Sequence, residues 1–183
     1  LLLPHLDLLH LCRRLWRHRL EKVSLQAVER GILDLHRRGD VAGSLIPAIY
    51  FDFLHRGETE ALEGVLKHNL QDLLSMVLIL QEIIARVLAP VGQGALEGDP
   101  GEAIAIARLY FEKQMFDGCI ERVAALGSSP MGTSTEELWR ALVYRVLKRR
   151  VIPKAQRAEL AQQLAPAFQG DAEFARLQGR LRA

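Results

Sequence analysis

The pair of residues best suited to chemistry is His68 and Asp72, which lie four positions apart in a segment with a helical pattern. Residues spaced this way are neighbours on the surface of a helix, so the two side chains lie one turn apart. An imidazole can move a proton near neutral pH, and a carboxylate can bind a hard divalent cation. The alternative is that both side chains belong to a solvated helix face.

Apolar residues occupy the other side of the same segment. The residues at helical spacing are Leu66, Leu70, Leu73, Val77 and Ile84. This periodicity predicts one long helix that is capped by Thr59, continues to about Ala89 and is stopped by Pro90. The helix therefore carries a mixed surface, with the His68–Asp72 pair roughly opposite an apolar stripe.

A second candidate site is the basic stretch near the start of the chain. Arg13, Arg14 and Arg17 surround Trp16 in a segment whose pattern predicts a helix over residues 8–20. Closely spaced cations with an interleaved aromatic ring can hold a phosphate backbone and stack a base, so these four residues are predicted to bind nucleic acid. The alternative is that Trp16 is part of the core and the arginines are simply solvated.

No stretch alternates with a period of two for long enough to predict a strand, and we expect an all-α chain. A short helix follows Ser24, which can act as its cap, and runs to residue 33. Another begins at a cap on Ser44, has Pro47 in its first turn and ends at Gly57. Its aromatic residues are expected to be core, namely Tyr50, Phe51 and Phe53.

From residue 101 onward, the pattern predicts a helix pair over residues 102–113 and 116–126. A second pair joins the helix that carries Ala141 and Tyr144 to a helix over residues 154–168, and residues 171–181 would form a terminal capping helix. Ala107 and Tyr110 recur as Ala141 and Tyr144, and both pairs share the same 34-residue offset that tetratricopeptide repeats have. The small residue lets paired helices approach, and the aromatic fills the space beside it. This pattern predicts tetratricopeptide-like α-helical repeats over residues 101–183, which can bind a protein partner.

The bulk properties describe an ordinary globular chain. It has 183 residues and a formal net charge of +2, which does not by itself predict nucleic-acid binding. The two cysteines, Cys12 and Cys119, have no metal-like spacing. Without a signal peptide or a membrane-spanning run, we expect a cytoplasmic protein with no membrane partner. Because the first residue is not Met, we expect a fragment of a longer protein.

Proline and glycine residues between positions 90 and 101 mark a boundary. They divide the chain into residues 1–90, a linker over 91–100 and the repeats over 101–183. An ordered series of segments in the first part resembles a known family. The segments are His5-Leu6-Asp7-Leu8-Leu9-His10, Arg13-Arg14-Leu15-Trp16-Arg17, Ser24-Leu25-Gln26 with Glu29, Ile46-Pro47-Ala48-Ile49-Tyr50-Phe51-Asp52-Phe53-Leu54, and His68-Asn69 with Asp72, Leu74 and Ser75.

Together these segments resemble the C-terminal half of a YprB-like ribonuclease H-like exonuclease domain of the DnaQ type. The resemblance implies a 3′–5′ exonuclease that holds two divalent metals, Mg²⁺ or Mn²⁺, and acts on DNA or RNA. It makes Asp72 a metal ligand and His68 the group that orients or deprotonates the attacking water.

The acidic first and second motifs of that family have no counterpart in this chain, so we expect it to be inactive alone. Two other hypotheses stay open. One is a non-catalytic helical scaffold that binds a protein partner, and the other is nucleic-acid binding without hydrolysis.

Overall fold

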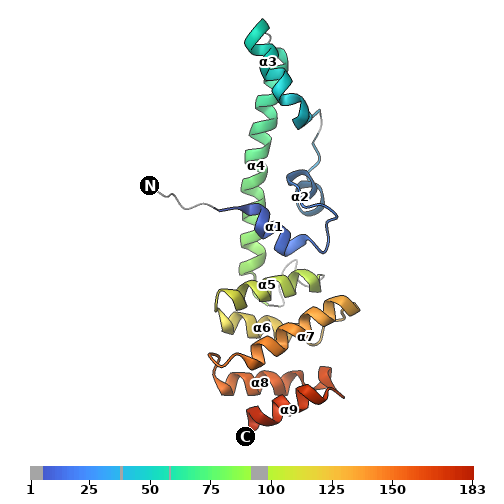
Figure 1. Cartoon of the computed structure of the whole chain (residues 1–183), viewed down its shortest axis with the longest axis vertical. Coiled ribbons are helices and arrows are strands. Elements are labelled where there is room, and N and C mark those ends of the chain that lie inside the picture. Colours follow the sequence, from blue (N-terminus) through green and yellow to red (C-terminus); the bar gives the residue numbers. More distant parts are fainter. Residues whose placement is uncertain (1–5, 38, 58, 92–98) are drawn as a thin grey trace. The chain divides into compact units, whose positions relative to one another are not determined.

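The structure is a computed structural model that describes residues 6–37, 39–57, 59–91 and 99–183. Its helices are α1 (Leu8–Trp16), α2 (Leu25–Ile32), η1 (Gly43–Leu45), α3 (Ile46–Arg56), α4 (Glu60–Leu88), α5 (Pro100–Glu112), α6 (Phe116–Leu126), α7 (Thr133–Lys148), α8 (Lys154–Leu164), η3 (Ala165–Phe168) and α9 (Ala172–Arg182). The described residues contain no strand, so the expected all-α fold is confirmed (Figure 1).

The chain divides into two compact units, Leu1–Ala85 and Arg86–Ala183. The division falls inside α4, whose last turn belongs to the second unit. The linker expected over residues 91–100 lies mostly on residues 92–98, which are outside the described part of the chain. No helix in the described ranges has both the length and the apolar content needed to span a membrane.

Local caps define the helices of the first unit. The Asp7 side chain accepts a hydrogen bond from the backbone of Leu9, and Ser24 accepts one from Ala27, as its predicted capping role requires. Gly57 ends α3 with a φ of 71°, a conformation that glycine adopts without strain. The cap expected at Ser44 is wrong, because the single turn η1 contains this residue and Leu45 occupies the cap position of α3.

The first unit has a small buried core. Its fully or nearly buried apolar residues are Cys12, Leu15, Trp16, Val28, Val65, Ile79 and Ile83. They come from α1, α2 and one side of α4. The polar residues Glu29 and Ser75 are buried with them, so the buried side of α4 is a mixed surface rather than an apolar one.

The apolar stripe of α4 is open. Leu66, Leu70, Leu73, Val77 and Ile84 are each about half exposed or more. Tyr50 and Phe51 of α3 are also exposed, and their expected place in a core is wrong. No other described residue covers these side chains. A large apolar area therefore stays in contact with water, which costs free energy.

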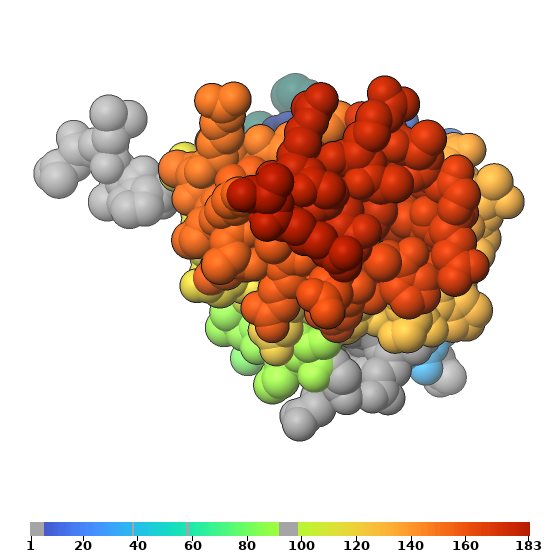
Figure 2. All heavy atoms as spheres, turned by 90° about the horizontal axis from the view of Figure 1, so that it is seen from below, coloured from blue at the N-terminus to red at the C-terminus, as the bar shows by residue number. Residues whose placement is uncertain are grey.

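The second unit stacks its helices in chain order from α5 to α9 (Figure 1). One apolar cluster runs through all of them, and Trp139, fully buried at its centre, donates a hydrogen bond to the Val123 carbonyl over 3.0 Å. In the space-filling view, α9 and the neighbouring segments close one end of this stack (Figure 2). The helices α8 and α9 contact one another directly.

The end of α4 is held by residues of this second unit. Arg86 pairs with the fully buried Glu102 over 2.8 Å, and Arg122 donates to the carbonyls of Val87 and Ala89 over 3.1 and 2.8 Å. The Arg122 guanidinium also lies 4.2 Å from the centre of the Tyr110 ring. These contacts satisfy carbonyl groups that a helix end otherwise leaves without partners.

The two positions that suggested a repeat differ in their surroundings. Ala107 is fully buried, whereas its counterpart Ala141 is exposed. Both tyrosines, Tyr110 and Tyr144, pack against aromatic or cationic side chains. The tetratricopeptide character of residues 101–183 therefore stays a prediction.

Candidate functional site

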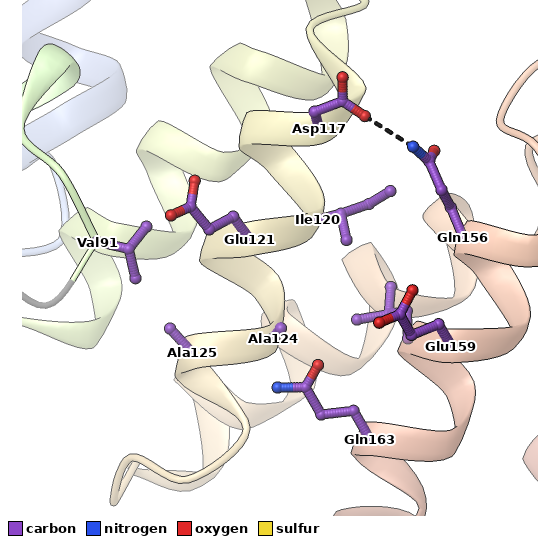
Figure 3. A pocket seen from close by; sticks show the side chains of 10 residues that line it. Val91, Asp117, Ile120, Glu121, Ala124, Ala125, Gln156, Glu159 and Gln163 are labelled. Carbon is purple, nitrogen blue, oxygen red and sulfur yellow. Dashed lines mark hydrogen bonds between the residues drawn. The ribbon is translucent and has the colours of Figure 1, made fainter.

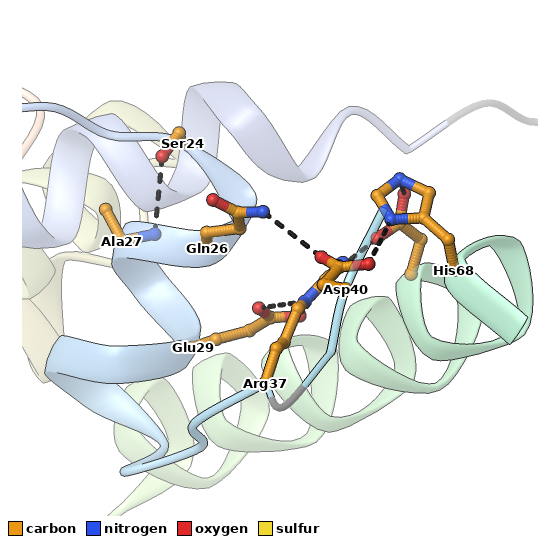
Figure 4. A network of polar contacts seen from close by, with 8 residues as sticks. Ser24, Gln26, Ala27, Glu29, Arg37, Asp40 and His68 are labelled. Carbon is orange, nitrogen blue, oxygen red and sulfur yellow. Dashed lines mark hydrogen bonds and ion pairs between the residues drawn. The ribbon is translucent and has the colours of Figure 1, made fainter. Parts of the chain in front are cut away.

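Arg37 lies at the centre of a polar network that also contains Glu29, Asp40 and His68 (Figure 4). Its Nε and Nη2 atoms donate to the two carboxylate oxygens of Glu29 over 2.7 and 2.5 Å. Nη1 donates to Asp40 over 3.1 Å, and Nη2 also donates to Asp72 Oδ1 over 2.6 Å. One guanidinium thus joins α2, the segment after it and α4.

His68 belongs to the same network. Its Nδ1 atom lies 2.6 Å from Asp40 Oδ1, and its Nε2 atom lies 3.5 Å from Asp72 Oδ2. The expected adjacency of His68 and Asp72 on one helix face is therefore present in the structure. Asp40 touches both Arg37 and His68, so it links the arginine to the imidazole.

The network is more buried at one end than at the other. The Glu29 side chain is 1% exposed and Arg37 is 7% exposed, whereas Asp72 is 32% exposed. Burial alone would raise the pKa of Glu29, but hydrogen bonds from Arg37 and Ser75 outweigh it and hold that pKa below its usual value. The hydrogen bond to His68, followed by the bond from Arg37, lowers the pKa of Asp40.

The backbone after α2 explains how Arg37 reaches Glu29. The Leu35 amide donates to the Glu29 carbonyl over 2.9 Å, so the chain turns back over the end of α2. Asp34 and Gly39 adopt positive φ values of 53° and 66°, which such a tight return requires. Sequence reasoning named Glu29 only within the family resemblance. It gave Arg37 and Asp40 no role in a site.

The described residues do not by themselves fit a divalent metal. Around Asp72, both neighbouring carboxylates, Glu29 and Asp40, already accept hydrogen bonds from Arg37. No group of three or more histidine, cysteine or acidic side chains in the described ranges could hold a metal ion. Asp72 is thus a single partly exposed carboxylate, and Mg²⁺ and Mn²⁺ need more oxygen ligands than that.

The residues of the basic stretch of α1 differ in their exposure to solvent. Arg13, Arg14 and Arg17 are exposed, which suits contact with a phosphate backbone. Trp16 is fully buried in the core, so the expectation that it stacks on a base does not hold in this structure. The alternative that Trp16 belongs to the core is the one that the structure supports.

The second unit contains a groove between α6 and α8 with a volume of about 470 Å³ (Figure 3). Its apolar floor includes Ile120 and Leu160, and acidic side chains line it, namely Asp117, Glu121 and Glu159. Gln156 donates to Asp117 over 3.0 Å and joins the two helices at one end of the groove. Among the residues that the structure describes, no lysine or arginine lines this groove.

Two comparisons with known proteins bear on the first unit. Residues 2–84 match a family model described as the RNase_H superfamily. A protein of Bacillus subtilis (strain 168) named "Uncharacterized protein YprB" is 34% identical over 122 residues, which make up 67% of this chain but 29% of that protein. The chain thus spans less than a third of the length of that relative.

No solved structure matches the chain significantly. The two similarities support a ribonuclease H-like domain in the part of the chain that contains His68 and Asp72.

Proposed function

We propose that residues 1–90 are the helical C-terminal part of a DnaQ-type 3′–5′ exonuclease domain whose intact gene product hydrolyses nucleic acid with Mg²⁺ or Mn²⁺. The observation that carries this proposal is the pairing of His68 with Asp72 on one face of α4, at the partly exposed end of the Arg37 network. The match of residues 2–84 to the RNase_H superfamily supports it.

The open apolar surface of the first unit is consistent with this proposal. Leu66, Leu70 and Leu73 are each more than half exposed, although a leucine side chain gains about 2 kcal/mol from full burial. A further part of a ribonuclease H-like domain, supplied by the intact gene product, would cover this stripe. The relative YprB is long enough to contain such a part, since the matched region is only 29% of its length.

In this proposal the residues have separate roles. Asp72 supplies one oxygen ligand to the metal ions, and the other acidic ligands come from outside the described residues. His68 orients or deprotonates the attacking water, which requires the imidazole to reach that water directly. The exposed guanidinium groups of Arg13, Arg14 and Arg17 contact phosphates of the nucleic acid. The chain alone is inactive in this proposal, because the residues in its described ranges do not complete a metal site.

An end-labelled digestion assay tests the proposal. The intact gene product is incubated with Mg²⁺ or Mn²⁺ and a single-stranded DNA or RNA oligonucleotide that carries a fluorophore at its 5′ end. A 3′–5′ exonuclease shortens the labelled product one nucleotide at a time. The proposal is wrong if neither nucleic acid is degraded with either metal by a folded protein.

A second candidate function is that of a helical scaffold whose repeats bind a protein segment. The groove between α6 and α8 favours it, because an apolar floor lined by Glu121 and Glu159 is complementary to a peptide with basic side chains. Fluorescence anisotropy with an arginine-rich peptide tests this function. Binding should weaken when both glutamates are changed to lysine, and equal binding by the altered chain would exclude the groove.

A further inference from the structure

One nitrogen atom of Arg37 lies between two carboxylates from different helices. Nη2 is 2.5 Å from Glu29 Oε1 and 2.6 Å from Asp72 Oδ1. The same guanidinium also reaches Asp40 through Nη1 over 3.1 Å. Three carboxylates therefore converge on one side chain that is 7% exposed.

Three carboxylates gathered in a largely buried place need a cation, because unpaired charges are costly to remove from water. The planar guanidinium suits this position, since its donors point in several fixed directions and can serve all three partners at once. The arginine thus supplies the positive charge that the carboxylates of Glu29, Asp40 and Asp72 need.

We infer that Arg37 is a built-in cation that takes the place of a metal ion between Glu29 and Asp72, and that it thereby acts as a positioning residue for Asp72. As long as the guanidinium is present, divalent cations are excluded from the space between Glu29, Asp40 and Asp72 Oδ1, whereas Asp72 Oδ2, which Arg37 does not bind, stays available to a metal ion. The part of this inference that concerns catalysis rests on the proposed function. The exclusion of metal from the cluster does not, and it can be measured on this chain without any activity.

The direct test measures Mn²⁺ binding to the full chain. Electron paramagnetic resonance detects binding as a loss of the signal of free Mn²⁺. Replacing the guanidinium by an uncharged side chain of similar length, Arg37→Met, leaves three converging carboxylates without a cation. We expect this variant to bind one Mn²⁺ ion with an affinity at least about tenfold higher than that of the unaltered chain. Adding Asp72→Asn should return the affinity to that of the unaltered chain.

Arg140→Met is the matched control. Arg140 also pairs with carboxylates, Glu136 over 2.9 Å and Asp171 over 3.9 Å, but it lies in the second unit. The net charge changes equally in both variants, so tighter Mn²⁺ binding by the Arg37 variant alone identifies the cluster. The inference is overturned if a folded Arg37→Met chain binds Mn²⁺ no more tightly than the control.

If Arg37→Met does not fold, a loss of the helical circular dichroism signal reveals it. Two further measurements then test the inference. Arg37→Lys keeps the charge but has a single nitrogen, which serves fewer of the three partners, and its Mn²⁺ affinity should exceed that of the unaltered chain. In the unaltered chain, the Arg37 Nε–H resonance should keep its position when millimolar Mg²⁺ is added. A saturable shift of that resonance would show metal entering the cluster and would contradict the inference.

These outcomes separate the inference from the proposed function. An inactive gene product would leave the Mn²⁺ measurements unaffected, because they depend only on the residues around Arg37. Conversely, a gene product that needs Asp72 for hydrolysis would support the proposed function even if Arg37→Met gained no metal.

Discussion

Arg37 donates a hydrogen bond of 2.6 Å to Asp72, although 35 positions separate the two residues in the sequence. This bond ties the segment after α2 to the middle of α4. It also gives the partly exposed Asp72 carboxylate a fixed partner at one oxygen, while His68 approaches the other. The His68–Asp72 pair that we propose for the nuclease is thus part of a structural network and is not a free helix surface.

The network should make the first unit sensitive to acid. Hydrogen bonds from Arg37 and Ser75 offset the effect of burial and hold the pKa of Glu29 below its ordinary value of 4.5, so the folded state binds fewer protons than the unfolded state there. The stability that this carboxylate contributes is present above about pH 4.5 and is lost as the pH falls further.

Glu29→Gln should therefore cost about 3 kcal/mol at pH 7 and flatten the dependence of stability on pH below 5. Urea unfolding followed by Trp16 fluorescence, in a chain that carries Trp139→Phe, measures this. The exposed substitution Glu21→Gln, which lies outside the helices, should change neither quantity. An equally steep acid dependence in Glu29→Gln would show that other groups cause it.

The open apolar stripe of α4 should matter only in the intact gene product. Leu70 is 58% exposed, so Leu70→Gln should change the free energy of unfolding of this chain by less than about 0.5 kcal/mol. In the intact gene product the same change should cost about 2 kcal/mol, because the docking proposed above buries the leucine. Ile79→Ala, at a buried position of the same helix, should destabilise both proteins. Equal, small effects of Leu70→Gln in both would remove the proposed docking of this face.

Arg122 should be important for the end of α4. Arg122→Met removes its hydrogen bonds to the Val87 and Ala89 carbonyls and its contact with the Tyr110 ring. A loss of about 3 kcal/mol is expected, since hydrogen bonds from a charged donor are among the stronger ones. Thermal unfolding followed by circular dichroism measures it, with the exposed Arg150→Met as control. If Arg122→Met is as stable as the control variant, water replaces these hydrogen bonds without a cost in stability.

Both cysteines should be unreactive in the folded chain. Burial raises the pKa of Cys12 to about 11 and that of Cys119 to about 12, so little thiolate is present at pH 8. Ellman's reagent should react with neither thiol in the native chain and with both in urea. An exposed thiol introduced by Ser44→Cys should react at once and serve as the control. A fast phase in the unaltered chain would mean that one thiol opens to solvent without unfolding.

Much of the helical layout could be predicted from local residues. The long helix expected between Thr59 and Ala89 is observed as α4 (Glu60–Leu88), and the expected segment 116–126 matches α6. Caps, prolines and glycines set these boundaries through nearby hydrogen bonds, which the sequence shows directly. Burial could not be predicted in the same way, because the exposure of Tyr50 and Phe51 depends on what is available to cover them.

The candidate site was predictable only in part, for a similar reason. The contact between His68 and Asp72 follows from helix geometry alone, since they are one turn apart. The arrangement of Arg37 and Asp40 depends on how the chain returns after α2, and no local pattern predicts that return. The sequence also left two environments open for Trp16, and the packing of α1 decides between them by burying the ring.

The most direct test of the proposed nuclease is the effect of Asp72→Asn on hydrolysis by the intact gene product. With Mg²⁺ or Mn²⁺ and a single-stranded oligonucleotide, loss of a metal-binding carboxylate should lower the rate at least about a hundredfold, because metal ions stabilise the charges of the transition state. Asp52→Asn, an exposed change in the same unit, should leave the rate unaltered. If the folded Asp72→Asn protein hydrolyses as fast as that control, the role proposed for Asp72 is wrong.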